Sequence, residues 1–505
     1  MTSDELAQRI GNLPPSTDYR NAGREHEDYV RDECGVFGVY GHRESAKLIY
    51  LGLYALQHRG QEGAGICCAD DGALSTHRGV GLVSDVFKPH KLARVNGTHG
   101  IGHVRYSTFG SSSLRNVQPL VADYAHGSMA VAHNGNFVNA DVLREELEAQ
   151  GAIFQSTTDS EVLVHQIARS DGETFTDRVV DALRRVIGAF SMVAMDQNVI
   201  VAARDPYGFR PLWLGRLDES YVVASETCAL DIIDAEWVRE IEPGEVVTIS
   251  KHRVRSRRPF NDLVKPQQCI FEFIYVARPD SYIFGKNVDE VRKEMGRRLA
   301  RVQPVDADMV MAVPDSSNPA ALGYSHESGI TFDMGFIRNH YVGRTFIEPD
   351  QGIRDFGVKI KLNPSRRTVE GKRIVLVDDS IVRGTTARKI IKMLRRCGVK
   401  EVHFRVASPR IINSCHYGID TPDRQKLIAH NLSVEEIAEF LGVDSLAYLP
   451  IPDMLEATGC NPEQFCTACF NNAYPTQLPS DFQPKVEHQR HVDHSTEIYE
   501  NWAAN

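Results

Sequence analysis

The stretch Ile374–Thr386, which reads IVLVDDSIVRGTT, decides the fold of the C-terminal half of the chain. Its first four residues are apolar, as in a buried parallel strand, and they lead directly into Asp378 and Asp379. A loop containing Gly384 follows, and then a helical segment, Thr386–Arg396. Ligands bind at the carboxyl edge of parallel strands, and the first N–H groups of a helix can hold a phosphate. The stretch therefore predicts an α/β domain with a phosphate site.

Two carboxylates beside a phosphate site suit the recognition of ribose hydroxyls and of Mg²⁺ shared with substrate oxygens. Taken alone, the acidic pair could simply cap a helix and the glycine could simply turn the chain. The complete ordered stretch, however, resembles the phosphoribosyl pyrophosphate signature of type I phosphoribosyltransferases. The resemblance implies that Asp378 and Asp379 contact the ribose and Mg²⁺, and that the loop holds the 5′-phosphate. The implied substrate contacts in this stretch are Asp378, Asp379, Ser380, Arg383, Gly384, Thr385 and Thr386.

Two further segments fit the same site. Val313–Ser317 leaves a predicted strand, Met309–Val313, and enters a turn; ordinary turn chemistry also explains its residues. By the resemblance, its residues contact pyrophosphate and Ser316 also contacts Mg²⁺. The basic segment Tyr341–Arg367 could be a solvated loop, but it resembles the lid that closes over the substrate in this family. The residues implied by these two segments are Asp315, Ser316, Ser317 and Lys361.

The strand–loop–helix order recurs along this half, with strands at Met309–Val313 and Arg373–Val377 and a further strand that ends at Val406. Such βαβ units predict a parallel sheet. We assign residues 265–474 to this domain and residues 475–505 to a polar tail.

The N-terminal half has a different pattern. Residues 1–33 are polar and charged, and we interpret them as a leader. At Cys34 a strand-like alternation begins, and residues 34–264 predict a mixed, mostly antiparallel α+β domain that ends in a linker, Lys251–Pro266. The expected strands lie at Gly127–His133, Phe190–Ala194, Val199–Ala203, Tyr221–Ser225 and Glu245–Ile249, and the expected helices at Ser45–His58, Ser160–Ser170 and Thr174–Val186.

Cys34 opens this domain. If the leader is removed, the residue carries both a thiol and an α-amino group whose pKa of about 7.7–8.0 suits a base for that thiol. A buried strand cysteine is the commoner role. Four ordered motifs follow, however, and together with Cys34 they resemble the N-terminal-nucleophile glutaminase domain of class II amidotransferases, an αββα sandwich. These motifs are Leu56–Gly65, Gly102–Thr108, His133–Gly135 and Thr158–Glu161.

The resemblance gives roles to residues of these motifs. Arg105 can hold the glutamine carboxylate and Asp159 its ammonium group. The Asn134 side chain and the Gly135 N–H can form an oxyanion hole, although Asn134-Gly135 alone would indicate a hairpin turn. Arg59 is expected to line the glutamine pocket.

Cysteines give a third signal. Cys466 and Cys469 form a CxxC pair, which is compatible with zinc, a redox dithiol or chance. Nothing in the spacing selects Cys269 or Cys415 as their partners. The chain resembles the leader-bearing branch of the glutamine phosphoribosylpyrophosphate amidotransferases, in which four cysteines in this pattern hold a [4Fe–4S] cluster. The implied ligands are Cys269, Cys415, Cys466 and Cys469.

That family makes phosphoribosylamine, glutamate and pyrophosphate from glutamine, water and phosphoribosyl pyrophosphate at the start of purine synthesis. Purine nucleotide inhibition and a homotetramer are further expectations from the resemblance. A net charge of -10 over 505 residues argues against nucleic-acid binding, and the sequence has no membrane-length apolar run. We expect a cytoplasmic enzyme. The alternatives are another amidotransferase of the same superfamily, such as a glucosamine-phosphate- or asparagine-forming enzyme, a non-catalytic sensor of phosphoribosyl pyrophosphate or purines, and a zinc-stapled scaffold.

Overall fold

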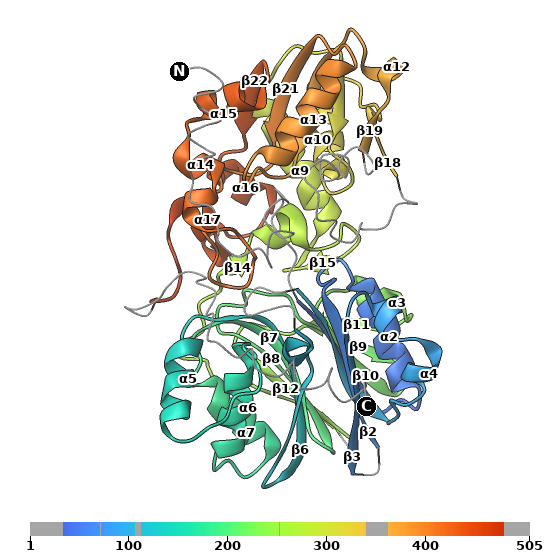
Figure 1. Cartoon of the computed structure of the whole chain (residues 1–505), viewed down its shortest axis with the longest axis vertical. Coiled ribbons are helices and arrows are strands. Elements are labelled where there is room, and N and C mark those ends of the chain that lie inside the picture. The colour runs from blue at the N-terminus through green and yellow to red at the C-terminus, as the bar shows by residue number, and fades with distance from the viewer. Residues whose placement is uncertain (1–33, 71, 107–112, 252, 340–361, 479–505) are drawn as a thin grey trace, which may run out of the picture.

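The chain folds into two lobes, seen in a computed structural model that describes residues 34–70, 72–106, 113–251, 253–339 and 362–478. The N-terminal lobe, at the bottom of Figure 1, contains two large sheets side by side. The C-terminal lobe, at the top, contains a smaller sheet with helices on both sides.

Two antiparallel sheets make up the centre of the N-terminal lobe. The first has seven strands in the order β11 (Glu236–Glu240), β9 (Trp213–Leu217), β10 (Ser220–Ala224), β1 (Gly35–Tyr40), β4 (His99–Arg105), β2 (Gly63–Asp70) and β3 (Ala73–Val80). The second has six, in the order β13 (Arg253–Arg257), β12 (Val246–Ser250), β8 (Val199–Arg204), β7 (Gly188–Met195), β6 (Gly127–Phe137) and β5 (Leu120–Tyr124).

The side chains that alternate along these strands fill three apolar layers. Between the sheets, Val36 and Ile101 of the first sheet join one core with Ala132 and Val193 of the second. On the outer faces, α2 (Ser45–Ala55) covers the first sheet, and α5 (Ala140–Ala149), α6 (Ser160–Arg169) and α7 (Phe175–Leu183) cover the second. The result is a helix–sheet–sheet–helix sandwich, which confirms the predicted αββα fold.

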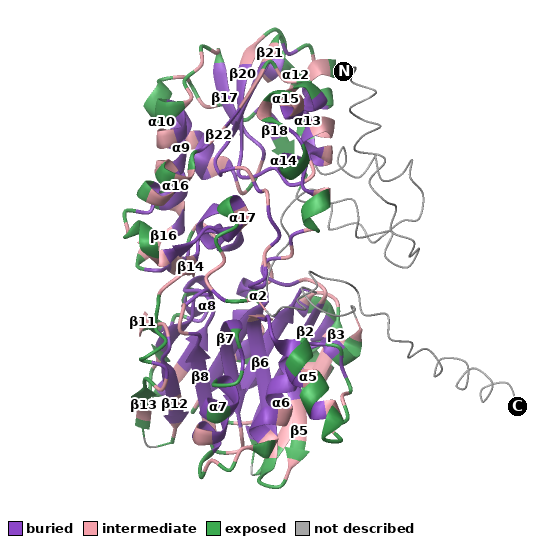
Figure 2. Ribbon diagram, turned by 90° about the vertical axis from the view of Figure 1, so that its left-hand side faces the viewer, coloured by how far each residue is buried: buried purple, intermediate pink, exposed green. Residues whose placement is uncertain are grey.

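The C-terminal lobe is built on a four-stranded parallel sheet. Its order is β17 (Met309–Ala312), β20 (Arg373–Asp378), β21 (Glu401–Val406) and β22 (Ser445–Tyr448). Neighbouring side chains of β20 point to opposite faces: Val375 and Val377 pack with helices α9 (Val288–Val302) and α10 (Asn318–Ser328). Ile374 and Leu376 pack with α13 (Thr385–Arg396) and α15 (Val434–Leu441). Both faces are buried (Figure 2), which confirms the α/β prediction.

One expectation about an individual segment was wrong, and two other segments differ from their simplest interpretation. The expected linker Lys251–Pro266 begins with β13, which pairs with β12 as the edge strand of the second sheet. Its exposed arginines are typical of a protected sheet edge and concealed the strand in the sequence. Asn134 and Gly135 lie within β6 opposite β7, which excludes the alternative of a hairpin turn at this pair. Thr476, in the expected polar tail, is buried and its N–H donates to the Tyr417 hydroxyl (3.1 Å).

No helix of the described residues is long and apolar enough to cross a membrane.

Candidate functional site

The predicted nucleophile, Cys34, lies directly before β1 and is buried. Because β1 pairs with β4 so that Gly35 faces Val104, Cys34 comes to the end of β4, beside the predicted carboxylate ligand Arg105. The Cys34 thiol lies 3.6 Å from the carbonyl oxygen of Tyr106, which follows Arg105. The two residues are far apart in sequence, and the sheet register brings them together.

The predicted oxyanion hole lies on β6. Asn134 is 1% exposed, and neither its amide oxygen nor its amide nitrogen has a hydrogen-bond partner among the described residues. A buried amide without partners is costly, so such an amide is often kept for a ligand. Gly135 has φ +146°, and a Cβ placed there would lie 2.0 Å from the carbonyl oxygen of Ala189. Only glycine fits this position of the strand.

Asp159 lies just before α6, where it is buried and anchored. Its Oδ2 accepts a hydrogen bond from the Phe137 N–H (3.0 Å), and its Oδ1 accepts one from the Ser160 hydroxyl (3.2 Å). The His133 Nδ1 lies 3.8 Å from the same carboxylate, but burial lowers the pKa of His133 and favours its neutral form. Arg105 is also buried, and its Nη1 lies 3.9 Å from a Glu62 carboxylate oxygen. The two charged side chains that the sequence predicts to bind glutamine, Arg105 and Asp159, are thus both buried.

Arg59 occupies a different environment from the one expected. Its guanidinium is fully buried and forms ion pairs with Glu226 of the N-terminal lobe and Glu272 of the C-terminal lobe. Arg210 Nη1 lies 3.4 Å from the same Glu272. Glutamine contact by Arg59 therefore stays a prediction, whereas its place in a buried ionic network between the lobes is a finding.

The second site lies where β17 and β20 end. The Ser316 hydroxyl donates to Asp379 (2.5 Å), and the Ser317 hydroxyl donates to Asp378 (2.9 Å). The Ser380 hydroxyl donates to the other oxygen of Asp379 (2.8 Å). Burial raises the pKa of Asp379, although these hydroxyls and the more distant Arg292 oppose the shift. The two predicted loops therefore converge on one pair of carboxylates.

The predicted phosphate loop completes this site. Gly384 has φ +77° and immediately precedes α13, so that the N–H groups of Thr385 and Thr386 stand at the start of a helix. A small pocket runs from Asp378 to this helix start, and it is lined by Asp378, Ser380, Ile381, Val382, Gly384, Thr386 and Ala387.

Three other predicted residues are Arg383, Asp315 and Lys361, and none of them is among the described residues that line this pocket. Arg383 directly precedes Gly384 in the loop. Asp315 is half exposed and forms an ion pair with Arg338. Lys361 and most of the expected lid, residues 340–361, lie outside the described residues.

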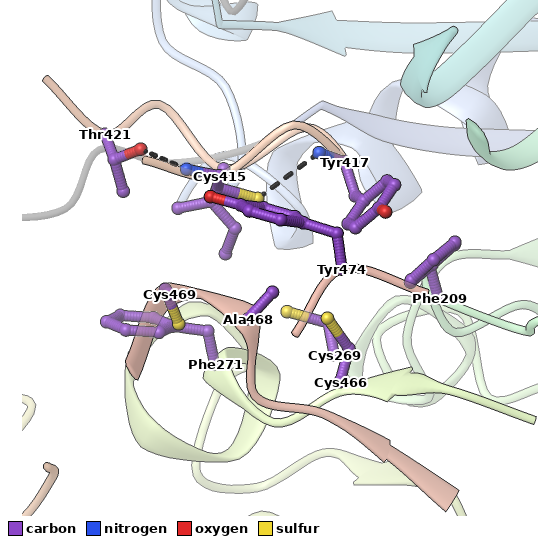
Figure 3. Close-up of a pocket in the computed structure, with 11 residues that line it drawn as sticks. Phe209, Cys269, Phe271, Cys415, Tyr417, Thr421, Cys466, Ala468, Cys469 and Tyr474 are labelled. Atoms are coloured by element: carbon purple, nitrogen blue, oxygen red, sulfur yellow. Dashed lines mark hydrogen bonds between the residues drawn. The ribbon is translucent and has the colours of Figure 1, made fainter. Parts of the chain in front are cut away.

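The four predicted cluster cysteines line a single pocket between the lobes (Figure 3). Cys269 and Cys466 are opposite each other in a short parallel pair, β14 (Gln268–Cys269) with β23 (Phe465–Cys466). Cys469 follows on α17 (Ala468–Asn471), and Cys415 reaches in from the facing loop. Aromatic rings of Phe209, Phe271, Tyr417 and Tyr474 supply most of the remaining wall.

The chemistry of this pocket fits an iron–sulfur group. Burial raises the pKa of Cys466 to about 12, and burial and the neighbouring thiols also raise the pKa of Cys469. Thiolates gathered in an apolar pocket would repel one another, so the arrangement favours a ligand that brings positive charge. Among the described residues, no group of three or more His, Cys, Asp or Glu side chains is arranged around one metal ion. A cluster holds its ligands farther apart than a single ion does.

Sequence reasoning missed Glu226, Glu272 and Arg210. All three are fully buried ions. The residues beside them in the sequence form no motif. The one feature of the sequence that could have predicted their burial is that each charged residue lies within an apolar stretch.

A fold that combines an αββα sandwich with a parallel phosphoribosyltransferase sheet defines a glutamine amidotransferase that uses a phosphoribosyl acceptor. The family model of a glutamine amidotransferase domain matches residues 103–231. An Arabidopsis thaliana protein, the chloroplastic amidophosphoribosyltransferase 1, is 53% identical over 470 residues, 93% of this chain and 82% of that protein. The Bacillus subtilis amidophosphoribosyltransferase is 47% identical over 457 residues, 90% of this chain and 96% of that protein.

The structure of the B. subtilis glutamine phosphoribosylpyrophosphate amidotransferase in complex with ADP and GMP superimposes with a TM-score of 0.85. It is 46% identical, and the match covers 89% of this chain and 99% of that chain. The chain belongs to the amidophosphoribosyltransferase family. The resemblance seen in the sequence is thereby confirmed for the family, and the iron–sulfur branch stays a prediction.

Proposed function

We propose that the chain transfers the amide nitrogen of glutamine to phosphoribosyl pyrophosphate, forming phosphoribosylamine, glutamate and pyrophosphate as the first step of purine synthesis. The observation that carries the proposal is that one chain combines two features: the buried Asn134 amide beside Gly135, which has no hydrogen-bond partner among the described residues, and the Asp378–Asp379 pair, which meets the Ser316–Ser317 loop ahead of α13. A sensor that does not catalyse would have no need for the first of these.

The glutamine half-reaction begins at Cys34. Once residues 1–33 are removed, the α-amino group of Cys34 can accept the proton of its own thiol. The thiolate then attacks the side-chain amide carbon of glutamine, ammonia leaves, and water hydrolyses the thioester to glutamate. Arg105 and Asp159 hold the carboxylate and the ammonium of the substrate, so that the amide faces the thiol.

The oxyanion that forms during the attack needs donors that are already in place. The Asn134 amide nitrogen and the Gly135 N–H supply them, and burial strengthens both interactions because water is excluded.

The acceptor half-reaction takes place at the end of the parallel sheet. Asp378 and Asp379 bind the ribose hydroxyls, and the N–H groups at the start of α13 bind the 5′-phosphate. Asp315, Ser316 and Ser317 face the pyrophosphate. Ammonia passes between the sites inside the protein, where it stays unprotonated, and displaces pyrophosphate from C1 of the ribose.

Mg²⁺ belongs to this site in the proposal. Asp378, Asp379 and Ser316 would hold it, since Mg²⁺ prefers one or two carboxylates together with substrate phosphates. When bound, it neutralises the charge of the leaving pyrophosphate.

The four-cysteine pocket would hold a [4Fe–4S] cluster through Cys269, Cys415, Cys466 and Cys469. Neither half-reaction transfers electrons, so the cluster would join segments of the chain or respond to oxygen.

Regulation and assembly are also part of the proposal. The B. subtilis structure contains ADP and GMP, and we infer that this chain, too, is inhibited by purine nucleotides. A homotetramer and a cytoplasmic location stay predictions; the plant relatives are named chloroplastic.

The test is glutamate release from glutamine by protein purified without oxygen, with and without phosphoribosyl pyrophosphate and Mg²⁺. We expect the second substrate to stimulate glutamate release, pyrophosphate to appear in equal amount, and Cys34→Ala to abolish both. Glutamine hydrolysis without any response to phosphoribosyl pyrophosphate would contradict the acceptor. Inactivity of protein with a mature Cys34 N-terminus would instead favour the sensor.

A further inference from the structure

The loop that carries Cys415 reaches the glutaminase site of the other lobe. Cys415 and the Tyr417 ring line the four-cysteine pocket, while the backbone of the three residues after Cys415 runs along the N-terminal lobe at β6. Figure 3 shows Cys415 and Tyr417 on this loop, with the Tyr417 N–H directed at the Cys415 thiol (3.3 Å). The loop therefore contacts both the pocket and the lobe that contains the nucleophile.

Each of these three residues contacts the N-terminal lobe through its backbone. The carbonyl oxygen of His416 accepts a hydrogen bond from the Asn136 side chain (3.0 Å). The carbonyl oxygen of Tyr417 accepts one from Arg210 (2.8 Å). Gly418, with φ +110°, lies so close to β6 that a Cβ on it would be 3.1 Å from both the Cα and the carbonyl carbon of Gly135.

The loop is itself held firmly. The Tyr417 ring stacks on Phe209 with 4.2 Å between ring centroids, and its hydroxyl bonds to Thr476 (2.9 Å). Gly135 is then enclosed on two sides, with the Ala189 carbonyl across the sheet and Gly418 from the other lobe. The position of the Gly135 N–H therefore depends on both neighbours. A hydrogen-bond donor stabilises an oxyanion well only if it lies within a few tenths of an ångström of its ideal position.

We propose that the backbone of His416–Gly418 is a positioning element for the oxyanion hole of the glutaminase site, which it contacts through Gly135 and Asn136. The inference deepens the glutamine half of the proposed function and rests on it. A loop of the phosphoribosyltransferase lobe thus positions the oxyanion hole that serves Cys34.

The test uses the full-length protein with Gly418→Ala, which inserts a methyl group against Gly135. Asn136→Ala removes the hydrogen bond to the His416 carbonyl oxygen without adding volume. This second variant tests the same inference if Gly418→Ala folds poorly. Gly442→Ala is the matched control, because Gly442 also has a positive φ (+76°) but has nothing within 4 Å of an added Cβ. For each protein we measure glutamine-dependent and ammonia-dependent phosphoribosylamine formation, and the rate at which iodoacetamide alkylates Cys34.

We expect Gly418→Ala to lower kcat with glutamine about tenfold or more, as a displaced oxyanion donor should, and Asn136→Ala to lower it in the same direction. KM for glutamine, the ammonia-dependent rate and the alkylation of Cys34 should stay close to wild type, because none of them uses the oxyanion hole. Gly442→Ala should resemble wild type throughout.

Equal losses with glutamine and with ammonia would overturn the inference, because they would indicate a general structural effect. So would unchanged kcat with glutamine in both variants. Failure of the proposed function has a different signature: wild-type protein itself would release no glutamate, or would release it without forming phosphoribosylamine from either nitrogen source.

Discussion

Arg59 and Glu272 form an ion pair that is fully buried and joins the glutaminase lobe to the phosphoribosyltransferase lobe. Glu226 binds the same guanidinium from the other side. Two buried carboxylates thus share the Arg59 guanidinium, with Arg210 as a second partner of Glu272 and His58 as a second partner of Glu226, and this sharing makes the network testable.

Arg59→Met should strongly destabilise the protein. The substitution leaves Glu226 and Glu272 buried without their common partner, which typically costs about 3–5 kcal/mol. Thermal and denaturant unfolding measure the loss. Arg301→Met removes an exposed ion pair with Glu327 and should barely change the transition. A similar small effect at Arg59 would mean that the lobes do not depend on this network.

Glu226 should make the protein sensitive to acid. Burial alone would raise its pKa, but Arg59, His58 and the Ser281 hydroxyl together hold the pKa of Glu226 well below its usual value. A depressed pKa means that its contribution is complete above about pH 4.5, the ordinary range of a glutamate, and is lost as the pH falls toward the folded-state pKa. Denaturation midpoints between about pH 6 and 3 should fall less steeply in Glu226→Gln than in wild type. Parallel pH profiles would refute the assignment.

Gly135→Ala should remove glutamine use and spare ammonia use. A methyl group at this position meets the Ala189 carbonyl, so β6 must shift and carry the oxyanion donors away. We expect glutamine-dependent activity to fall about a hundredfold or more. Gly371→Ala, at a positive φ with open space around it, is the control. Retention of glutaminase activity in Gly135→Ala would place the oxyanion hole elsewhere.

Asp379→Asn should act on the other half-reaction. It removes one of the two charges at the acceptor site but leaves the hydroxyls of Ser316 and Ser380 in place. Pyrophosphate release should fall about a hundredfold, while glutamine hydrolysis without phosphoribosyl pyrophosphate stays near wild type. Asp308→Asn, which loses contacts with Arg373 at the opposite end of the strand, should retain pyrophosphate release.

Cys415→Ala should lower the metal content of the protein. Wild type purified without oxygen is expected to contain about four irons with sulfide per chain, and the variant much less. Cys397→Ala, at the end of α13, should retain the wild-type content. Zinc in place of iron would remove the cluster from the proposal and support a zinc-stapled scaffold.

The fold was largely predictable because local pattern and tertiary structure agree. The apolar run Ile374–Val377 is buried on both faces, as its composition requires, and Asp378 ends the strand at the small pocket before α13. The αββα sandwich was less visible, since β2 and β4 are continuous buried runs without a polar face. The edge strand β13 was missed for the opposite reason, because its arginines resemble a solvated linker.

The sites were predictable where a motif supplies several groups within a few residues. The convergence of Ser316 and Asp379 follows from the order of parallel strands, and the structure confirms that the two loops meet. The contacts between the lobes are not marked by any sequence motif. His416 and Gly418 act through backbone atoms, which any sequence provides, and Glu272 is a single acid in an apolar stretch. Only the three-dimensional arrangement reveals them.

The short parallel pair β14–β23 also fixes an order of events during synthesis. Cys269 precedes the entire phosphoribosyltransferase sheet in the chain, whereas its partner Cys466 follows the last strand of that sheet. While the ribosome is still translating the intervening residues, the pocket has at most half of its thiols. The complete set of four thiols, and with it any group that needs all four, is therefore available only after translation has passed Cys469.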